Sequence, residues 1–99
     1  MAYTIKLHPE AEKEYLEAYQ WYEEHQVGLG ERFEIAVEKQ IKLIADNPEH
    51  YAEKKYKCRE CKTETFPYLI VYKFYPTKRL IWITSVFHTS RKPSKKNRK

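Results

Sequence analysis

The spacing of apolar residues divides the first half of the chain into one strand and two helices. Residues 3–7 alternate apolar and polar side chains, which predicts a short strand. Residues 9–25 and 31–45 each place their apolar and aromatic side chains on one helical face. Gly28 and Gly30, the only glycines of the protein, lie between these two segments. We therefore expect two helices joined by a tight turn, as an antiparallel helical hairpin.

The second half of the chain has the pattern of β structure. Residues 68–75 are β-branched and aromatic and give the strongest strand prediction, and residues 80–88 predict a further strand after a short turn. Residues 57–65 have a mixed composition that fits a third strand. The predicted order is thus β-α-α-β-β-β, an α+β fold. Because the helical hairpin is the available cover for an apolar sheet face, we expect it to pack on a small antiparallel sheet.

The parity of the last strand predicts which of its side chains reach the core. We expect Ile81, Ile83 and Phe87 to face the helices and His88 to end the strand on the less buried side. In the strand predicted at residues 68–75, the odd and the even positions are both largely apolar, so the pattern does not tell which tyrosines are exposed. The length of 99 residues fits one domain, which we place at residues 1–91, followed by a basic and mobile tail at 92–99.

Composition narrows the class of protein. With 41% hydrophobic and 15% aromatic residues, the chain is too apolar for a disordered protein, even at 33% charged residues. No apolar run approaches the roughly 18 residues of a membrane span, and the first residues lack an apolar signal-peptide core. A soluble cytoplasmic protein without a membrane partner is the simplest interpretation.

The two cysteines, Cys58 and Cys61, form a single C-x-x-C motif. Such a motif supplies only half of a four-cysteine zinc site, and two cysteines do not make a disulfide scaffold. In a strand, residues three apart point to opposite faces and are poorly placed to chelate or to bridge. We expect two ordinary reduced thiols and no metal.

Charge is divided unevenly along the chain, whose formal net charge is +5. Residues 1–53 carry 12 acidic and 5 basic side chains, whereas residues 54–99 carry 2 acidic and 14 basic side chains. A basic second half next to an acidic first half favours a polyanionic or acidic protein partner. The alternative is a surface whose two halves complement each other, followed by a solubilising tail.

The usual catalytic and cofactor motifs are absent from the sequence, so no cofactor is expected. The basic and aromatic residues that remain fit metal-free RNA cleavage, which needs phosphate binding, proton transfer and stabilisation of the phosphorane charge. The candidates are Lys57, Arg59 and Arg91 for phosphate, Tyr68 and Tyr72 for base or partner contacts, and His88 for proton transfer.

Each candidate also has a structural interpretation. Tyrosines such as Tyr68 and Tyr72 are more often core or rim aromatics than binding residues, and His88 fits a strand-end histidine bonded to the backbone equally well. Arg59 fits an ion pair with Glu60, with Glu64 or with a helix glutamate. Composition and spacing alone therefore predict a small basic α/β domain that binds an acidic partner.

Four short motifs in a fixed order give a family resemblance. These are GLGERF at 28–33, NPE at 47–49, FPY at 66–68 and VFH at 86–88. Together with the helical start they resemble the RelE/ParE superfamily of toxins from bacterial type II toxin–antitoxin modules, over about residues 3–93.

The resemblance implies a cytoplasmic protein that arrests growth unless a cognate antitoxin binds it. ParE-like members inhibit DNA gyrase, whereas RelE-like members cleave mRNA on the ribosome without a metal; a non-toxic binding module on the same fold is the third alternative. The helical hairpin looks slightly more like the ParE side. In RelE-like members residue types such as those at Arg59, His88 and Arg91 support cleavage, but Glu60 stands where relatives often have a second arginine.

Overall fold

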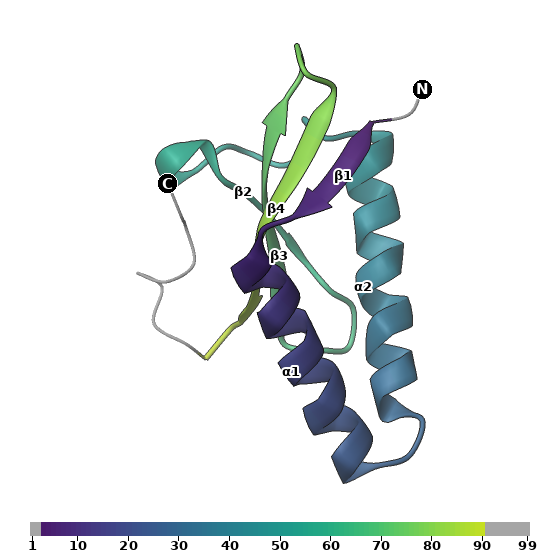
Figure 1. The fold of residues 1–99 in the computed structure, drawn as a ribbon. Coiled ribbons are helices and arrows are strands. Elements are labelled where there is room, and N and C mark those ends of the chain that lie inside the picture. Colours follow the sequence, from purple (N-terminus) through teal and green to yellow (C-terminus); the bar gives the residue numbers. More distant parts are fainter. Residues whose placement is uncertain (1–2, 91–99) are drawn as a thin grey trace.

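The computed structural model describes residues 3–90, which form two helices packed on one face of a four-stranded sheet (Figure 1). Arg91 and the predicted tail at 92–99 lie outside the described residues. Within residues 3–90, neither helix has the length and apolar character needed to cross a membrane. The elements are β1 (Thr4–Leu7), α1 (Pro9–His25), α2 (Leu29–Asp46), the 3-10 turn η1 (Lys55–Lys57), β2 (Arg59–Lys62), β3 (Tyr68–Tyr75) and β4 (Leu80–His88).

The sheet has the strand order β1-β4-β3-β2. Strands β2, β3 and β4 form the antiparallel meander that the sequence predicts. β1 adds to the far edge and pairs in parallel with β4, with Thr4 opposite Leu80 and Leu7 opposite Ile83. The sheet is therefore mixed, which the alternation within β1 could not reveal because it does not specify a pairing partner. In Figure 1 the β3–β4 hairpin extends beyond the helices at the top of the view.

The helical hairpin forms as predicted, with a tighter connection. α1 spans the predicted residues, and α2 begins at Leu29, directly after Gly28, whose φ of 88° is left-handed. Gly30 lies inside the first turn of α2, where a Cβ atom would approach the Tyr19 carbonyl oxygen to 2.9 Å. The Glu23 carboxylate of α1 accepts hydrogen bonds from the backbone N–H groups of Gly28 and Gly30. A side chain of α1 thus caps the N-terminus of α2 and joins the two helices.

The core lies between the helical hairpin and one face of the sheet. Phe33 of α2 is its centre and contacts the rings of Tyr15, Tyr22, Phe66 and Tyr68, with centroids 5.1–5.7 Å apart. The same core also contains the buried aliphatic residues Val37, Ile44, Ile70, Ile81, Ile83 and Val86.

A β-bulge in β4 changes the predicted parity of that strand. Val71 pairs with Ser85 but Tyr72 pairs with Ile83, so Thr84 is an extra residue. After the bulge, Val86 faces the helices, and Phe87 packs on the opposite face with Val71. The prediction was right for Ile81 and Ile83 but wrong for Phe87, because alternation assumes an uninterrupted strand.

A carboxylate of α1 stabilises this bulge. Glu14 Oε1 accepts hydrogen bonds from Ser85 Oγ at 2.9 Å and from the Val86 backbone N–H at 3.0 Å. The irregular backbone of β4 is thus satisfied from the helix that covers it. As a result His88, two residues beyond Val86, ends the strand beside α1 instead of on the open face.

β2 is shorter than the predicted strand at 57–65. Tyr56 and Lys57 have left-handed φ values of 59° and 61°, so the chain turns before Arg59. After Lys62 the chain turns again, where the Thr63 hydroxyl donates to the Phe66 carbonyl oxygen at 2.8 Å.

Cys58 and Cys61 face opposite sides of the sheet, as the spacing predicts. Both are buried free thiols, and burial raises the pKa of each.

Candidate functional site

The strand register places the predicted site residues in two separate places. At one end of β3, Tyr68 pairs with His88. Tyr72 lies four residues further along β3 and pairs with Arg59 on the other neighbouring strand. At about 3.3 Å per residue, the two pairs are roughly 13 Å apart along the strand. His88 and Arg59 therefore do not form one site, and Arg91 lies outside the described residues.

Arg59 fastens the segment that follows α2. Its Nη1 donates to the carbonyl oxygens of Tyr51 at 2.5 Å and Glu49 at 3.3 Å, and its Nη2 lies 3.5 Å from a Glu53 carboxylate oxygen. Only 13% of its side chain is exposed. Arg59 thus forms an ion pair, as one interpretation of the sequence suggested, but its partner is Glu53 and not Glu60, Glu64 or a helix glutamate. In this arrangement Nη1 is occupied by the protein's own backbone and Nη2 faces the Glu53 carboxylate, whereas the buried Nε has no hydrogen-bond partner among residues 3–90.

Tyr72 also binds the segment that follows α2. Its side chain is fully buried, and its hydroxyl donates to the Pro48 carbonyl oxygen at 2.7 Å. Burial is also the main reason that the pKa of this phenol is raised. Tyr72 offers no surface to a partner in this structure, and its position is that of a core aromatic.

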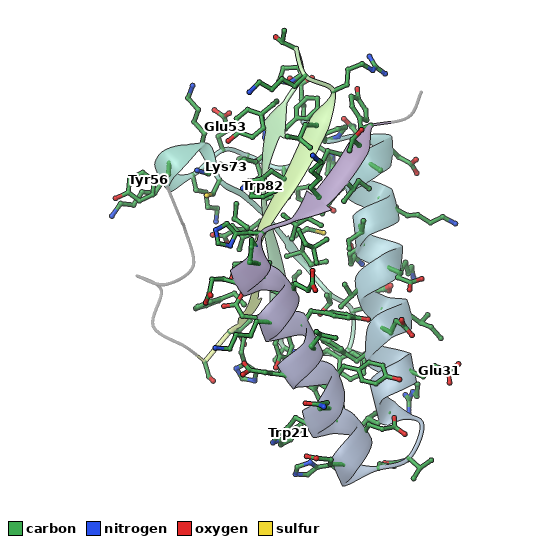
Figure 2. All side chains as sticks on the ribbon, viewed as in Figure 1. Trp21, Glu31, Glu53, Tyr56, Lys73 and Trp82 are labelled. Atoms are coloured by element: carbon green, nitrogen blue, oxygen red, sulfur yellow. The ribbon has the colours of Figure 1, made fainter. Side chains whose placement is uncertain are left out.

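Lys57 lies at the exposed tip formed by η1. The tip also carries Lys54, Lys55 and Tyr56, and Figure 2 shows Tyr56 at its outer end. The ammonium group of Lys55 lies 5.2 Å from the centroid of the Tyr56 ring. Three lysines around a partly exposed tyrosine form a basic protrusion that can contact an anionic partner.

His88 and Tyr68 contact each other at the other end of the sheet. Their rings meet edge to face, with centroids 5.0 Å apart. His88 Nδ1 accepts a hydrogen bond from the Ser90 backbone N–H at 3.1 Å and lies 2.7 Å from Ser90 Oγ. This confirms the interpretation of His88 as a strand-end histidine bonded to the backbone, and it leaves Nε2 for other contacts.

An open pocket of about 540 Å³ lies beside His88, between α1 and the ends of β3 and β4. Two carboxylates and three aromatic residues dominate its wall, and no lysine or arginine is found among the described residues that form it. The lining residues are Glu14, Glu17, Ala18, Trp21, Tyr22, Pro67, Tyr68, Val86, His88 and Ser90.

Trp21 is the most exposed aromatic residue of this pocket, with 54% of its surface accessible. Its indole stacks on the His25 ring, with centroids 3.8 Å apart, and Figure 2 shows it on the outer side of α1. His25 Nδ1 lies 2.7 Å from the Trp21 carbonyl oxygen, so the protonated Nδ1 donates to it. The imidazole is thereby held against the indole.

This pocket was not predictable from the sequence, because the charged and indole side chains that α1 contributes to it lie off the apolar stripe of the helix. Glu14, Glu17 and Trp21 are spaced i, i+3 and i+7, which places them on a second face of the helix. The available signal was Trp21, a large aromatic residue among charged neighbours. Tryptophan is unusual on a helix face that contacts only water, because its side chain is mostly buried in proteins.

Comparison with known proteins identifies the family. A model of the ParE toxin of type II toxin–antitoxin systems (parDE) matches residues 5–93. The chain belongs to this ParE toxin family. The resemblance to the RelE/ParE superfamily is thus confirmed, and a search of curated protein sequences finds no match.

Solved structures share the fold at low sequence identity. A chain of the chromosomal ParDE system from P. aeruginosa is 13% identical, with a TM-score of 0.74 over 90% of this chain and 98% of that one. A chain of the intact E. coli RelBE toxin–antitoxin complex is 20% identical, with a TM-score of 0.64 over 91% and 100%. The isolated E. coli RelE toxin is 18% identical, with a TM-score of 0.65 over 94% and 90%. The architecture of two helices on a four-stranded sheet is therefore that of RelE/ParE-like toxins.

Proposed function

We propose that this ParE-family toxin arrests growth by inhibiting DNA gyrase in the cytoplasm, and that a cognate antitoxin neutralises it. Family membership supports the toxin role and the antitoxin partner. The observation that carries the choice of gyrase is the separation of Arg59 from His88, because a cleavage site would need their chemistry at one phosphate.

The surroundings of His88 also oppose RNA cleavage. Cleavage requires cations that stabilise the phosphorane charge next to the proton-transfer group. Among the described residues, the wall of the His88 pocket instead carries Glu14 and Glu17. Carboxylates at this position repel a phosphate, since like charges brought together at an interface are unfavourable. The ribosome-dependent ribonuclease is therefore the second candidate, and among residues 3–90 the neighbouring Tyr68 and His88 rings favour it.

Two assays on the purified protein separate these functions. Titrating it into DNA gyrase should progressively reduce supercoiling of relaxed plasmid, and adding it to translating ribosomes should leave mRNA uncut. If supercoiling is unaffected at large excess while mRNA is cut, and His88→Gln or Arg59→Gln abolishes the cutting, the ribonuclease replaces our proposal.

Growth experiments test the toxin and its partner. Expression of the protein alone should arrest growth, and co-expression of the small protein encoded next to it should restore growth. Normal growth at confirmed soluble expression would instead support the non-toxic binding module.

A further inference from the structure

The acidic and aromatic pocket beside α1 matches the chemistry of a flat cation. We propose that it binds an arginine side chain that the antitoxin inserts between α1 and the ends of β3 and β4. This inference rests on the proposed function, because it takes the antitoxin as the partner. The carboxylates of this pocket belong to the acidic half of the chain, whereas the uneven charge distribution predicts an acidic partner for the basic half.

Two carboxylates supply the charge complementarity. Glu14 is fixed in place because its Oε1 accepts hydrogen bonds from Ser85 and Val86, so the position of this negative charge is set by the bulge of β4. Glu17 lies one helical turn further along the same wall. Within residues 3–90, Glu17 forms no ion pair, and it can therefore take a cation from a partner without losing an existing contact.

Aromatic rings supply the stacking surface. Trp21 is half exposed, and Tyr22 and Tyr68 also line the pocket. The stacked imidazole of His25 holds the indole from behind, so little conformational entropy is lost when a ligand stacks on Trp21. A tryptophan that is both held and exposed is the typical anchor of a protein interface.

The combination favours arginine over the other side chains. A guanidinium stacks flat on an aromatic ring while its N–H groups bind carboxylates, and it is more weakly hydrated than the lysine ammonium. An acidic side chain would meet two like charges. A purely apolar side chain would cover the Glu17 carboxylate without giving it an ion-pair or hydrogen-bond partner.

A ligand titration tests the pocket without any antitoxin. N-acetyl-arginine amide is added to the full chain while the indole N–H signal of Trp21 is followed by NMR. N-acetyl-citrulline amide, which has nearly the same shape but no charge, is the matched control ligand. We expect the arginine compound to bind about five-fold more tightly than the citrulline compound, as the sum of one exposed ion pair and one cation–π contact.

Two substitutions assign the effect to the pocket. Glu17→Gln should reduce the preference for arginine to about two-fold, the part that the cation–π contact contributes. Glu24→Gln, an exposed change on the same helix outside the pocket, should leave the preference unchanged. In the complex with the neighbouring-gene antitoxin, Glu17→Gln should weaken binding about two-fold, as expected for the loss of one exposed ion pair, and Glu24→Gln should not.

Three results would overturn the proposal. They are equal binding of the arginine and citrulline compounds, equal affinity of both variants for the antitoxin, and arginine binding that is seen only after Arg91→Gln. The last result would mean that the chain's own arginine, next in sequence after Ser90, takes the pocket. If the growth and gyrase assays fail while the titration succeeds, the proposed function is wrong and the arginine site stands with a different protein partner.

Discussion

Among residues 3–90, four residues other than glycine have left-handed backbone: Tyr56, Lys57, Thr65 and Arg79. This conformation costs roughly 1–2 kcal/mol for an ordinary residue, and it is least favourable for a β-branched one. Thr65 is the clearest case, because it has a φ of 73° and an exposed side chain. Its strain is offset by the turn that returns the chain from β2 to β3.

Thr65→Gly should therefore stabilise the protein. Glycine adopts the left-handed conformation without strain, which stabilises the folded state. Its greater conformational freedom in the unfolded chain offsets part of this gain. The free energy of unfolding should therefore rise by about 0.5–1 kcal/mol. Thr77→Gly, at a position of the β3–β4 turn whose own φ is not positive, should lower it by a similar amount. Urea denaturation measures both variants, and a lower stability for Thr65→Gly would show that its backbone is not strained.

Tyr72 gives a second prediction at the scale of one residue. Tyr72→Phe removes the donor to the buried Pro48 carbonyl and leaves that acceptor without its partner. The free energy of unfolding should fall by about 1–3 kcal/mol. Tyr75→Phe, at a tyrosine that is 39% exposed, is the control and should change it by less than about 0.5 kcal/mol. Equal effects of the two changes would contradict a structural role for the Tyr72 hydroxyl.

At the scale of elements, the helices and strands were predictable because their apolar residues recur at regular spacing. α1, β3 and β4 have the bounds that the periodicity indicates. The bulge in β4 was not predictable, because it depends on Glu14, which is 71 residues away in sequence from Ser85. One inserted residue was enough to move Phe87 and His88 to the faces opposite those expected.

The connection of α1 to α2 depends on the close approach of Gly30. Gly30→Ala would place a Cβ atom 2.9 Å from both the Tyr19 carbonyl oxygen and the Glu23 carboxylate, and backbone cannot move aside cheaply. We expect a loss of about 1–3 kcal/mol in the free energy of unfolding. Gly28→Asn is the matched control, since asparagine tolerates the left-handed conformation and no atom lies within 4 Å of a Cβ there. Urea denaturation should find a smaller loss for Gly28→Asn, which carries only the backbone strain of a left-handed position, and comparable losses in both variants would mean that the helices are not in contact at Gly30.

At the scale of the whole molecule, the candidate site depended on distances that the sequence does not contain. Arg59, Tyr68 and His88 have the residue types of a phosphate site, and these types alone suggested one. The register separates Arg59 from the other two. The carbonyl groups that occupy Arg59 belong to the segment after α2, which has no periodic pattern from which its path could be derived.

Tyrosine ionisation tests the packing of the entire fold. The pKa of Tyr15 is raised to about 12 by burial and by Glu34 and Glu38, and that of Tyr51 to about 12 by its hydrogen bond with Cys61 and by burial. The pKa of Tyr72 is also raised, by burial. In the unfolded chain each phenol titrates near pH 10. The folded protein therefore retains protons that the unfolded chain has already lost.

It follows that stability should be lost at alkaline pH. The contribution of these phenols is complete below about pH 10, because folded and unfolded forms are then equally protonated. It disappears as the pH rises through about 10 to 12, where the unfolded chain is ionised and the folded one is not. Tyrosinate absorbance and circular dichroism, recorded together, should show late ionisation that coincides with unfolding, and Tyr15→Phe should make the unfolding free energy less dependent on pH in this range. If all nine tyrosines ionise near pH 10 while the protein stays folded, the helical hairpin is not packed on the sheet as described.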